Sequence, residues 1–174
     1  MRVCQMLLLL VEVIMIKKID EKDIEKCVDV IKDSFSTVAD EFGLNIENAP
    51  RFTAFATTKE RLDWHLNGEH RPMYAFYDND YIVGYYSLLL QDDKECELNN
   101  LCVIPQYRHK GIGEELLNHA FKVAKDLKCN KINIGIVEEN QVLRKWYEKY
   151  GFVHTGTKKF DFFPFTCGYM EKQL

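Results

Sequence analysis

The chain lacks most of the features that mark secreted, metal-binding or multi-domain proteins. Its 174 residues include only four prolines and nine glycines, and these gather in no linker, repeat or low-complexity tract, which favours a single domain. The six cysteines form no C-x-x-C pair and show no metal-ligand spacing, so we expect reduced thiols packed in the core and no metal site. Reduced thiols suit the cytoplasm, which is the expected location.

An excess of positive charge is also lacking. The formal net charge of −4 argues against a nucleic-acid partner, because a nucleic-acid-binding domain usually carries a basic face or stripe. Hydrophobic residues make up 47% and charged residues 29% of the chain, which is typical of a globular protein. A chain of this length can form one domain with a full core.

The N-terminal segment has no hydrophobic run long enough to cross a membrane. The apolar stretch from Leu7 to Val11 ends at Glu12, and no small-residue cleavage site follows, so we expect neither a membrane span nor a signal peptide. We interpret residues 1–14 as an N-terminal extension upstream of the natural start, and residues 15–174 as the single domain. An additional strand within residues 1–14 is the alternative interpretation.

Hydrophobic periodicity and turn residues predict a mixed order of strands and helices. A first strand begins at Ile16 and leads into a helix from Asp20 to about Phe35, and a second helix follows the capping box Thr57-Thr58-Lys59-Glu60. Residues 42–55, between these helices, are expected to form a loop or a short helix. The later elements are expected to be antiparallel strands at 73–77, 81–90 and 95–104, a helix from residue 112, a strand at 131–137, a helix at 141–150, and strands at 153–159 and 167–173.

The most informative segment is Arg108-His109-Lys110-Gly111-Ile112-Gly113, which lies between an apolar strand and an amphipathic helix. A strand, a glycine-bearing turn and a helix N-terminus together form an anion site, because unpaired backbone N–H groups point outward there and the helix dipole favours negative charge. Gly111 and Gly113 have no side chains and allow a phosphate to approach the backbone. The helix carries apolar residues at helical spacing: Ile112, Leu116, Leu117, Ala120, Phe121, Ala124 and Leu127.

Two common phosphate loops do not fit this segment. A dinucleotide fingerprint, G-x-G-x-x-G counted from Gly111, would need a glycine where Leu116 stands, and the pattern G-x-x-x-x-G-K-[ST] is absent. A nucleotide-binding oxidoreductase is therefore disfavoured. The pattern that remains is R-x-x-G-x-G after a strand.

A second pattern lies downstream. Residues 131–137 form an apolar run typical of a buried strand, and Asn140 begins a short helix that ends at Gly151, a plausible glycine cap, with Phe152 behind it. An asparagine, a short helix with a tyrosine and a glycine–phenylalanine pair, in this order after R-x-x-G-x-G, resemble the two signatures of the GNAT N-acetyltransferase superfamily.

The resemblance implies a fold and a co-substrate. The fold is a mixed three-layer α/β/α arrangement with a mostly antiparallel central sheet, in which the strands at 98–104 and 131–137 lie parallel but splay apart at one end. The co-substrate is acetyl-CoA, whose pantetheine arm enters between these two strands, and no metal is implied.

The resemblance also assigns cofactor contacts. Backbone amides from His109 through Glu114 are expected to hold the pyrophosphate, and the amide of Val103 or a neighbour is expected to meet the thioester carbonyl. The 3′-phosphate could be reached by Lys110, Arg144 or Lys145. The residues expected to contact the cofactor are Leu101, Cys102, Val103, Arg108, His109, Lys110, Gly111, Ile112, Gly113, Glu114, Asn140, Leu143 and Tyr147. For Asn140, a role as helix N-cap is an equal alternative.

Two side chains are candidates for proton transfer. Tyr147 stands where relatives use a tyrosine to protonate the departing thiolate, and simple packing in an aromatic helix is its alternative. Glu97 is the candidate base that takes the proton of the amine, and an exposed strand glutamate is its alternative. Glu95 and Asn99 lie on the same face of the strand by alternation and are the fallback candidates.

The expected function is transfer of the acetyl group of acetyl-CoA to a primary amine of a small molecule or peptide, by direct attack in a ternary complex. A catalytically weak acyl-CoA-binding or regulatory module on the same fold is the alternative. Aromatic residues near the C-terminus suggest a pocket lined by rings, although a core or a dimer contact would explain them equally. No membrane partner is expected, and a homodimer stays open. His65 and His70 are expected on the surface.

Overall fold

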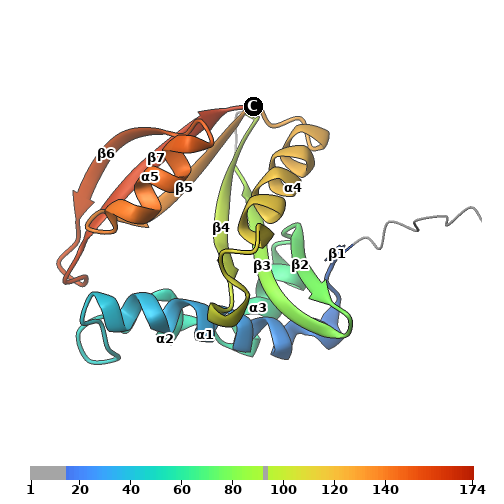
Figure 1. The fold of residues 1–174 in the computed structure, drawn as a ribbon, viewed down its shortest axis with the longest axis horizontal. Helices are drawn as coiled ribbons and strands as arrows, with labels where there is room; N and C mark the ends of the chain where they lie inside the picture. Colours follow the sequence, from blue (N-terminus) through green and yellow to red (C-terminus); the bar gives the residue numbers. More distant parts are fainter. Residues whose placement is uncertain (1–14, 92–93) are drawn as a thin grey trace, which may run out of the picture.

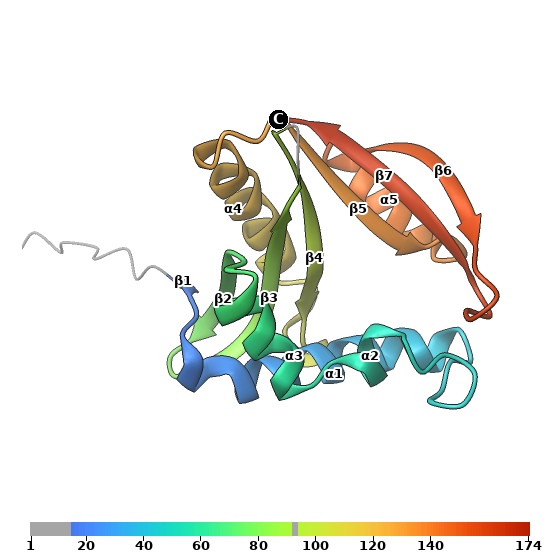
Figure 2. The ribbon, with the colours of Figure 1, turned by 180° about the vertical axis from the view of Figure 1, so that it is seen from behind.

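The computed structural model describes residues 15–91 and 94–174, so the extension expected at residues 1–14 lies outside the described residues. The described chain forms a seven-stranded sheet in the order β1-β2-β3-β4-β5-β7-β6 (Figures 1 and 2). Neighbouring strands are antiparallel except β4 and β5, which are parallel, as predicted. The strands are β1 (Ile16–Lys18), β2 (Met73–Asp78), β3 (Tyr81–Leu90), β4 (Glu95–Val103), β5 (Lys131–Val137), β6 (Val153–Lys159) and β7 (Thr166–Gln173).

Helices cover both faces of the sheet and give three layers. One face packs against α1 (Ile24–Glu41) and α3 (Lys59–Asp63), and the other against α4 (Ile112–Asp126) and α5 (Gln141–Lys149). None of the helices in the described ranges is long and apolar enough to span a bilayer. Shorter helical pieces are η1 (Glu21–Asp23), α2 (Thr53–Ala56), the π-helical turn η2 (Trp64–Gly68) and η4 (Pro105–Tyr107).

Two local predictions differ from the structure. Helix α1 continues past Phe35 to Glu41, because Ala39 extends the buried stripe into a third core cluster around Phe52. His65 is only 6% exposed, so the prediction that it lies on the surface is wrong, and burial lowers its pKa to about 4. It lies in the π-helical turn η2, whose wider turn shifts side chains away from the faces that a 3.6-residue period predicts. His70 is exposed, as predicted.

Gly151 ends α5 and fixes the neighbouring aromatic rings. Its φ is +87°, and its amide donates to the carbonyl of Glu148 at 3.0 Å. The amide of Phe152 donates to the carbonyl of Tyr147 at 3.2 Å, which completes the hydrogen-bond pair of a Schellman motif. The same turn places the ring of Phe152 with its centroid 5.3 Å from that of Tyr147. The predicted glycine cap therefore also positions a candidate catalytic side chain.

The substitution Gly151→Ala is expected to lower the free energy of unfolding by about 1–2 kcal/mol, because an L-residue is strained in the left-handed region. The added Cβ would lie 2.7 Å from Lys172 Nζ, but that flexible side chain can move aside. Thermal unfolding should show a Tm lower by roughly 2–8 °C. The matched control is Gly135→Ala, where the added Cβ has no atom within 4 Å and φ is not positive. An equal decrease in both variants would contradict the strain argument.

Candidate active site

Strands β4 and β5 pair only at their beginnings. The paired residues are Glu95 with Lys131, Cys96 with Ile132, and Glu97 with Asn133. Beyond these pairs β4 runs on to Val103 without pairing to β5, while β5 stays paired with β7 along its length. We call the diverging parts, residues 98–103 of β4 and 134–137 of β5, the splay (Figure 1). The predicted divergence of the two parallel strands is thus confirmed.

A bulge in β4 lies within the splay. Asn99 pairs with Ser87 and Cys102 with Tyr85, so β4 contains one residue more than β3 between these two pairs. Asn100 takes a positive φ of 55°, which asparagine tolerates better than most residues. A bulge bends a strand and increases its twist, and so contributes to the divergence of β4 from β5.

The end of β4 presents backbone groups to the splay. The amide of Ile104 donates to the carbonyl of Val83 in β3 at 3.0 Å. Because successive residues of a strand direct their N–H groups to opposite edges, the amide of Val103 faces away from β3, towards the splay. This orientation supports the predicted role of the Val103 amide as a donor to a thioester carbonyl, which stays a prediction.

Helix α4 begins with unpaired backbone amides. Gly111 is its N-cap with a φ of 86°, and no side chain caps the helix. The amide of Glu115 is the first to bond back to the turn, to the carbonyl of Gly111 at 3.0 Å. Within the described residues, the amides of residues 109–114 have no hydrogen-bond acceptor. The backbone geometry that an anion site needs is therefore present close to where β4 ends, and anion binding there stays a prediction.

The guanidinium of Arg108 joins β4 to α1. Its Nε donates to the carbonyl of Val103 at 3.0 Å, its Nη1 to Thr37 Oγ1 at 3.0 Å, and its Nη2 to the carbonyl of Ser34 at 2.8 Å. These bonds make Arg108 a residue that holds the end of β4 in place, and its direct contact with a cofactor stays a prediction. The next residue, His109, is exposed and has a φ of 61°.

The side chains of the other basic candidates differ in how strongly neighbouring residues hold them. Lys110 is exposed, with its Nζ 4.6 Å from the ring centroid of Tyr107. Arg144 is held between two carboxylates, Glu138 at 2.9 Å and Glu148 at 3.1 Å. Lys110 is therefore better placed than Arg144 to turn towards a phosphate.

Tyr147 of α5 lies buried in the core cluster that α4 and α5 cover. It is 6% exposed, and its ring centroid lies 4.9 Å from that of Trp146. Burial raises the pKa of the Tyr147 phenol, and Cys102 of β4 adds to the increase. The phenol therefore keeps its proton at neutral pH and can donate it.

Two carboxylates on the same face of β4, those of Glu95 and Glu97, have different environments. Glu95 forms an ion pair with Lys131 at 2.7 Å, and that partner lowers the pKa of its carboxyl. Burial raises the pKa of the Glu97 carboxyl, and Arg71 acts in the opposite direction. Asn99, the third residue of this face, donates from Nδ2 to the backbone carbonyl of Glu97 at 3.2 Å. Glu97 is thus the carboxylate of this group best suited to accept a proton.

Glu97 and Tyr147 approach the splay from opposite faces of the sheet. Cys96 and Leu98, which flank Glu97, belong to the core cluster beneath α4, and Tyr147 belongs to the same cluster. By alternation along β4, Glu97 therefore lies on the α1 face. A reaction at the splay would have a proton donor on one face and a proton acceptor on the other.

The remaining predicted contact residues have structural roles in the described chain. Asn140 caps α5, because its Oδ1 accepts from the amide of Leu143 at 3.0 Å. Leu101 and Leu143 pack partly buried against the α4 cluster, and Ile112 is 7% exposed within it. Burial raises the pKa of the Cys102 thiol to about 12, so it is protonated near neutral pH and not a nucleophile. Cofactor contacts by these residues stay predictions.

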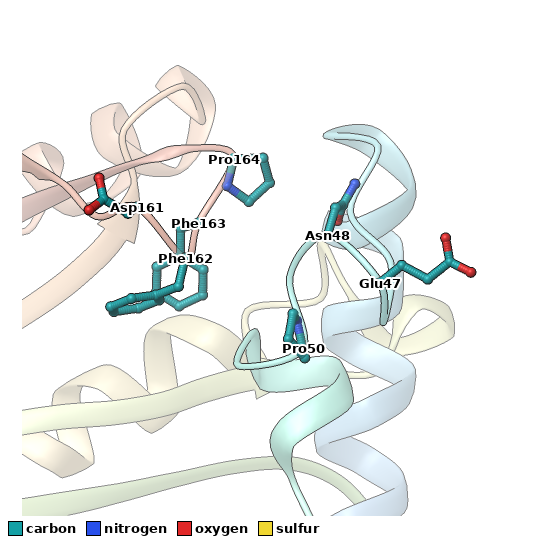
Figure 3. A pocket seen from close by; sticks show the side chains of 7 residues that line it. All are labelled: Glu47, Asn48, Pro50, Asp161, Phe162, Phe163 and Pro164. Atoms are coloured by element: carbon teal, nitrogen blue, oxygen red, sulfur yellow. The ribbon is translucent and has the colours of Figure 1, made fainter.

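An aromatic pocket lies between the segment after α1 and the loop that joins β6 to β7. Its volume is about 410 Å³ (Figure 3). The rings of Phe162 and Phe163 and the side chain of Glu47 extend away from one another (Figure 3). Two rings, Phe162 and Phe163, line this pocket, while Phe52 and Phe165 are buried in a core cluster, so both the pocket and the core alternative account for part of the aromatic residues. Its lining consists of Glu47, Asn48, Pro50, Asp161, Phe162, Phe163 and Pro164.

Sequence reasoning missed two residues that belong to this region. Arg71 lies near enough to Glu97 to lower its pKa, yet it is distant in the sequence and carries no motif. Trp146 lies beside the first turn of α4, where a Cβ placed on Gly113 would be 3.7 Å from its indole. Its place beside Tyr147 in the second signature was the signal that could have identified it.

Comparisons with known proteins agree with this geometry. The family model described as "Acetyltransferase (GNAT) family" matches residues 38–152. An uncharacterized N-acetyltransferase of Mycobacterium tuberculosis is 27% identical over 114 residues, covering 66% of this chain and 73% of that protein. The PaiA N-acetyltransferase of Thermoplasma acidophilum, in complex with coenzyme A, has a similar structure, with a TM-score of 0.78, 22% identity, and coverage of 91% of this chain and 98% of that one. A ribosomal-protein-alanine N-acetyltransferase of Brucella melitensis gives a TM-score of 0.71 at 20% identity, with coverage of 91% and 99%. At these identities the two structures show the fold.

Proposed function

The chain belongs to the GNAT acetyltransferase family, and from this premise we propose that it transfers the acetyl group of acetyl-CoA to a primary amine of a small molecule or peptide. The observation that carries the proposal is the row of unpaired amides at the start of α4, a helix that shares a core cluster with the buried Tyr147. A structural neighbour that holds coenzyme A supports the choice of co-substrate.

The residues present fit the proposed co-substrate. Acetyl-CoA supplies an activated acyl thioester and a diphosphate that needs hydrogen-bond donors. The amides of residues 109–114 provide such donors at a helix N-terminus, where the dipole also favours negative charge. The carboxylates of Glu114 and Glu115, in the first turn of α4, would repel a bound diphosphate. The backbone amides must therefore supply most of the attraction.

Three groups of the chain would then assist the transfer. The amide of Val103 would donate to the thioester oxygen, where negative charge develops during attack. Glu97 would accept the proton of the attacking amine, directly or through water, on the α1 face. Tyr147 would donate its phenolic proton to the departing sulfur on the opposite face. In this arrangement the amine attacks the thioester directly in a ternary complex, so the acetyl group is never carried by a side chain of the protein.

The substitution Glu97→Gln is expected to lower kcat about 10²-fold or more at neutral pH, the usual size of general-base catalysis. In the unaltered protein the carboxylate must be ionised, so kcat/KM should fall as the pH drops through the pKa of Glu97. Burial raises that pKa, so the decrease should begin above the usual range of a carboxyl group. The measurement is a pH–rate profile of both proteins, and the acidic limb should disappear in Glu97→Gln.

The matched control is Glu95→Gln, because this carboxylate lies on the same face of β4 but is neutralised by Lys131. Its kcat should stay within about threefold of the original, since a partly exposed ion pair contributes little. Equal losses in the two variants, or an unchanged acidic limb in Glu97→Gln, would show that another group is the base.

The proposal is tested by following thiol release from acetyl-CoA with a panel of acceptors. The panel should contain polyamines, aminoglycosides, amino acids and short peptides with a free α-amino group, beside a calorimetric titration with coenzyme A. Turnover that requires one class of amine would support the proposal. Tight binding of coenzyme A without turnover on any amine would favour an acyl-CoA-binding or regulatory module instead. Absence of coenzyme A binding would contradict both.

A further inference from the structure

A row of three residues crosses the sheet on the α1 face and ends at the proposed base. Leu89 of β3 pairs with Glu97 of β4. The ladder between β2 and β3 continues before the first residue of β2, because the amide of Leu88 donates to the carbonyl of Pro72 at 2.9 Å. The preceding residue, Arg71, therefore stands opposite Leu89. Arg71 and Glu97 are thus two strand spacings apart, about 10 Å between Cα atoms, and their long side chains extend from the same face.

The guanidinium of Arg71 is a largely buried cation. Its side chain is 11% exposed, its Nε donates to the carboxylate of Glu69, and its backbone amide donates to the carbonyl of His65 at 2.9 Å. Burial lowers the pKa of His65 to about 4, so this imidazole is uncharged near neutral pH. A buried cation requires opposite charge nearby. Glu69 supplies it on the more exposed side, and Glu97 supplies it along the row.

The other titratable groups around Glu97 are neutral or paired with each other. Lys131 of β5 is shared by Glu95 at 2.7 Å and Glu171 at 3.4 Å. Burial raises the pKa of the Tyr169 phenol of β7, with smaller contributions from neighbours that include Glu97, so this phenol stays uncharged. Helices α1 and α3 pack on this face through the apolar side chains of a core cluster. Within the described residues, the guanidinium is therefore the cation that acts on Glu97 and opposes the effect of burial on the pKa of its carboxyl.

We propose that Arg71 is a positioning residue for the proposed base: its guanidinium keeps the half-buried Glu97 carboxylate ionised, and Glu69 limits this effect because it shares the same cation. A general base works best when its pKa lies near the working pH. Burial alone would keep the carboxyl protonated, and an unopposed guanidinium would make the carboxylate a weak base. The two opposing influences therefore suit proton transfer from an amine. This inference deepens the proposed function and rests on it.

The ionisation of Glu97 can be measured without any acceptor, by NMR of the glutamate side-chain carboxyl carbons during a pH titration. Its signal is identified by its loss in Glu97→Gln. Arg71→Gln removes the cation and should move the titration midpoint of Glu97 to higher pH, by about half a unit or more. Glu69→Gln removes the competing carboxylate and should move the midpoint to lower pH. Arg71→Lys keeps a positive charge, so its midpoint should lie closer to that of the unaltered protein than the midpoint of Arg71→Gln does.

Shifts of opposite sign in Arg71→Gln and Glu69→Gln are the decisive result, because a general loosening of this face would move the midpoint in the same direction in both variants. An unchanged midpoint in Arg71→Gln, or shifts in the same direction, would overturn the inference and leave the proposed function standing. Should Arg71→Gln not fold, Glu69→Gln decides alone. A shift to lower pH then supports the inference, and no shift overturns it.

Kinetics then test whether this ionisation governs the reaction. In thiol release, the acidic limb of kcat/KM should move in each variant in the same direction as the NMR midpoint of Glu97. On that limb, kcat/KM of Arg71→Gln should be about threefold or more below that of the unaltered protein, which is the consequence of a shift of half a pH unit. A moved NMR midpoint with an unmoved acidic limb would overturn the inference. Absence of thiol release with every amine in the unaltered protein would overturn the proposed function, and the role of Arg71 with it.

Discussion

Replacement of Tyr147 by phenylalanine is expected to lower kcat by about 10²–10⁴-fold while coenzyme A still binds, since this is the usual contribution of a positioned proton donor. The hydroxyl is the only group removed, and the ring keeps its contacts with Trp146 and Phe152. Burial raises the pKa of this phenol, so the unaltered protein holds the donating form throughout the neutral pH range. Steady-state kinetics at saturating acetyl-CoA, with an acceptor found in the thiol-release panel, measures the effect.

Tyr150→Phe is the matched control for this prediction. The same hydroxyl is removed from Tyr150, the C-cap residue of α5. Burial and the neighbouring Glu114 carboxylate raise the pKa of the Tyr150 phenol. Its kcat should remain within about threefold of the original, because the hydroxyl has no part in the proposed proton transfer. If Tyr147→Phe retained full activity, water or another group would have to protonate the sulfur.

Introduction of a carboxylate at the start of α4, by Gly113→Glu, is expected to raise the Kd of coenzyme A more than about 100-fold. The new side chain would stand among the unpaired amides, accept their hydrogen bonds and repel the diphosphate. Folding should be preserved, because an acidic residue in the first turn of a helix is favourable. Calorimetric titration measures the affinity, and thermal unfolding measures the stability.

Two further substitutions at the same position separate charge from size. Gly113→Gln keeps the length of the glutamate side chain but removes its charge, so it should weaken binding less than Gly113→Glu does. Gly113→Ala adds a Cβ at an ordinary contact distance of 3.7 Å from Trp146, so the fold should accept it. Unchanged affinity in Gly113→Glu would place the phosphate site elsewhere.

Elements with strong local signals were predictable from the sequence. The bounds of β6 agree with the predicted strand at 153–159, and α5 ends at Lys149, one residue before the predicted end. Local periodicity and turn chemistry determine such elements. Helix α1 was predicted too short and His65 was placed wrongly, because a core cluster around Phe52 and a π-helical turn depend on contacts that no local pattern contains.

The backbone geometry of the candidate site could be predicted from the sequence more fully than the contacts of its side chains. Glycines at a helix start predict accessible backbone amides, and the positive φ of Gly111 is a conformation that its residue type favours. The role of Arg108 could not be foreseen in the same way. Its guanidinium bonds to α1 residues far away in the sequence, and only the tertiary fold brings them within reach.

The limited pairing of β4 with β5 also divides the chain into two consecutive pieces. Residues 15–128 supply β1 to β4, α4 and the proposed base, and residues 131–174 supply β5 to β7, α5 and the proposed acid. The polypeptide passes from one piece to the other once, through the short turn before Lys131. Neither piece holds both proton-transfer groups. The proposed catalysis therefore requires the two pieces to be docked on each other, and a substitution that loosens their contact should lower activity even when it lies far from both groups.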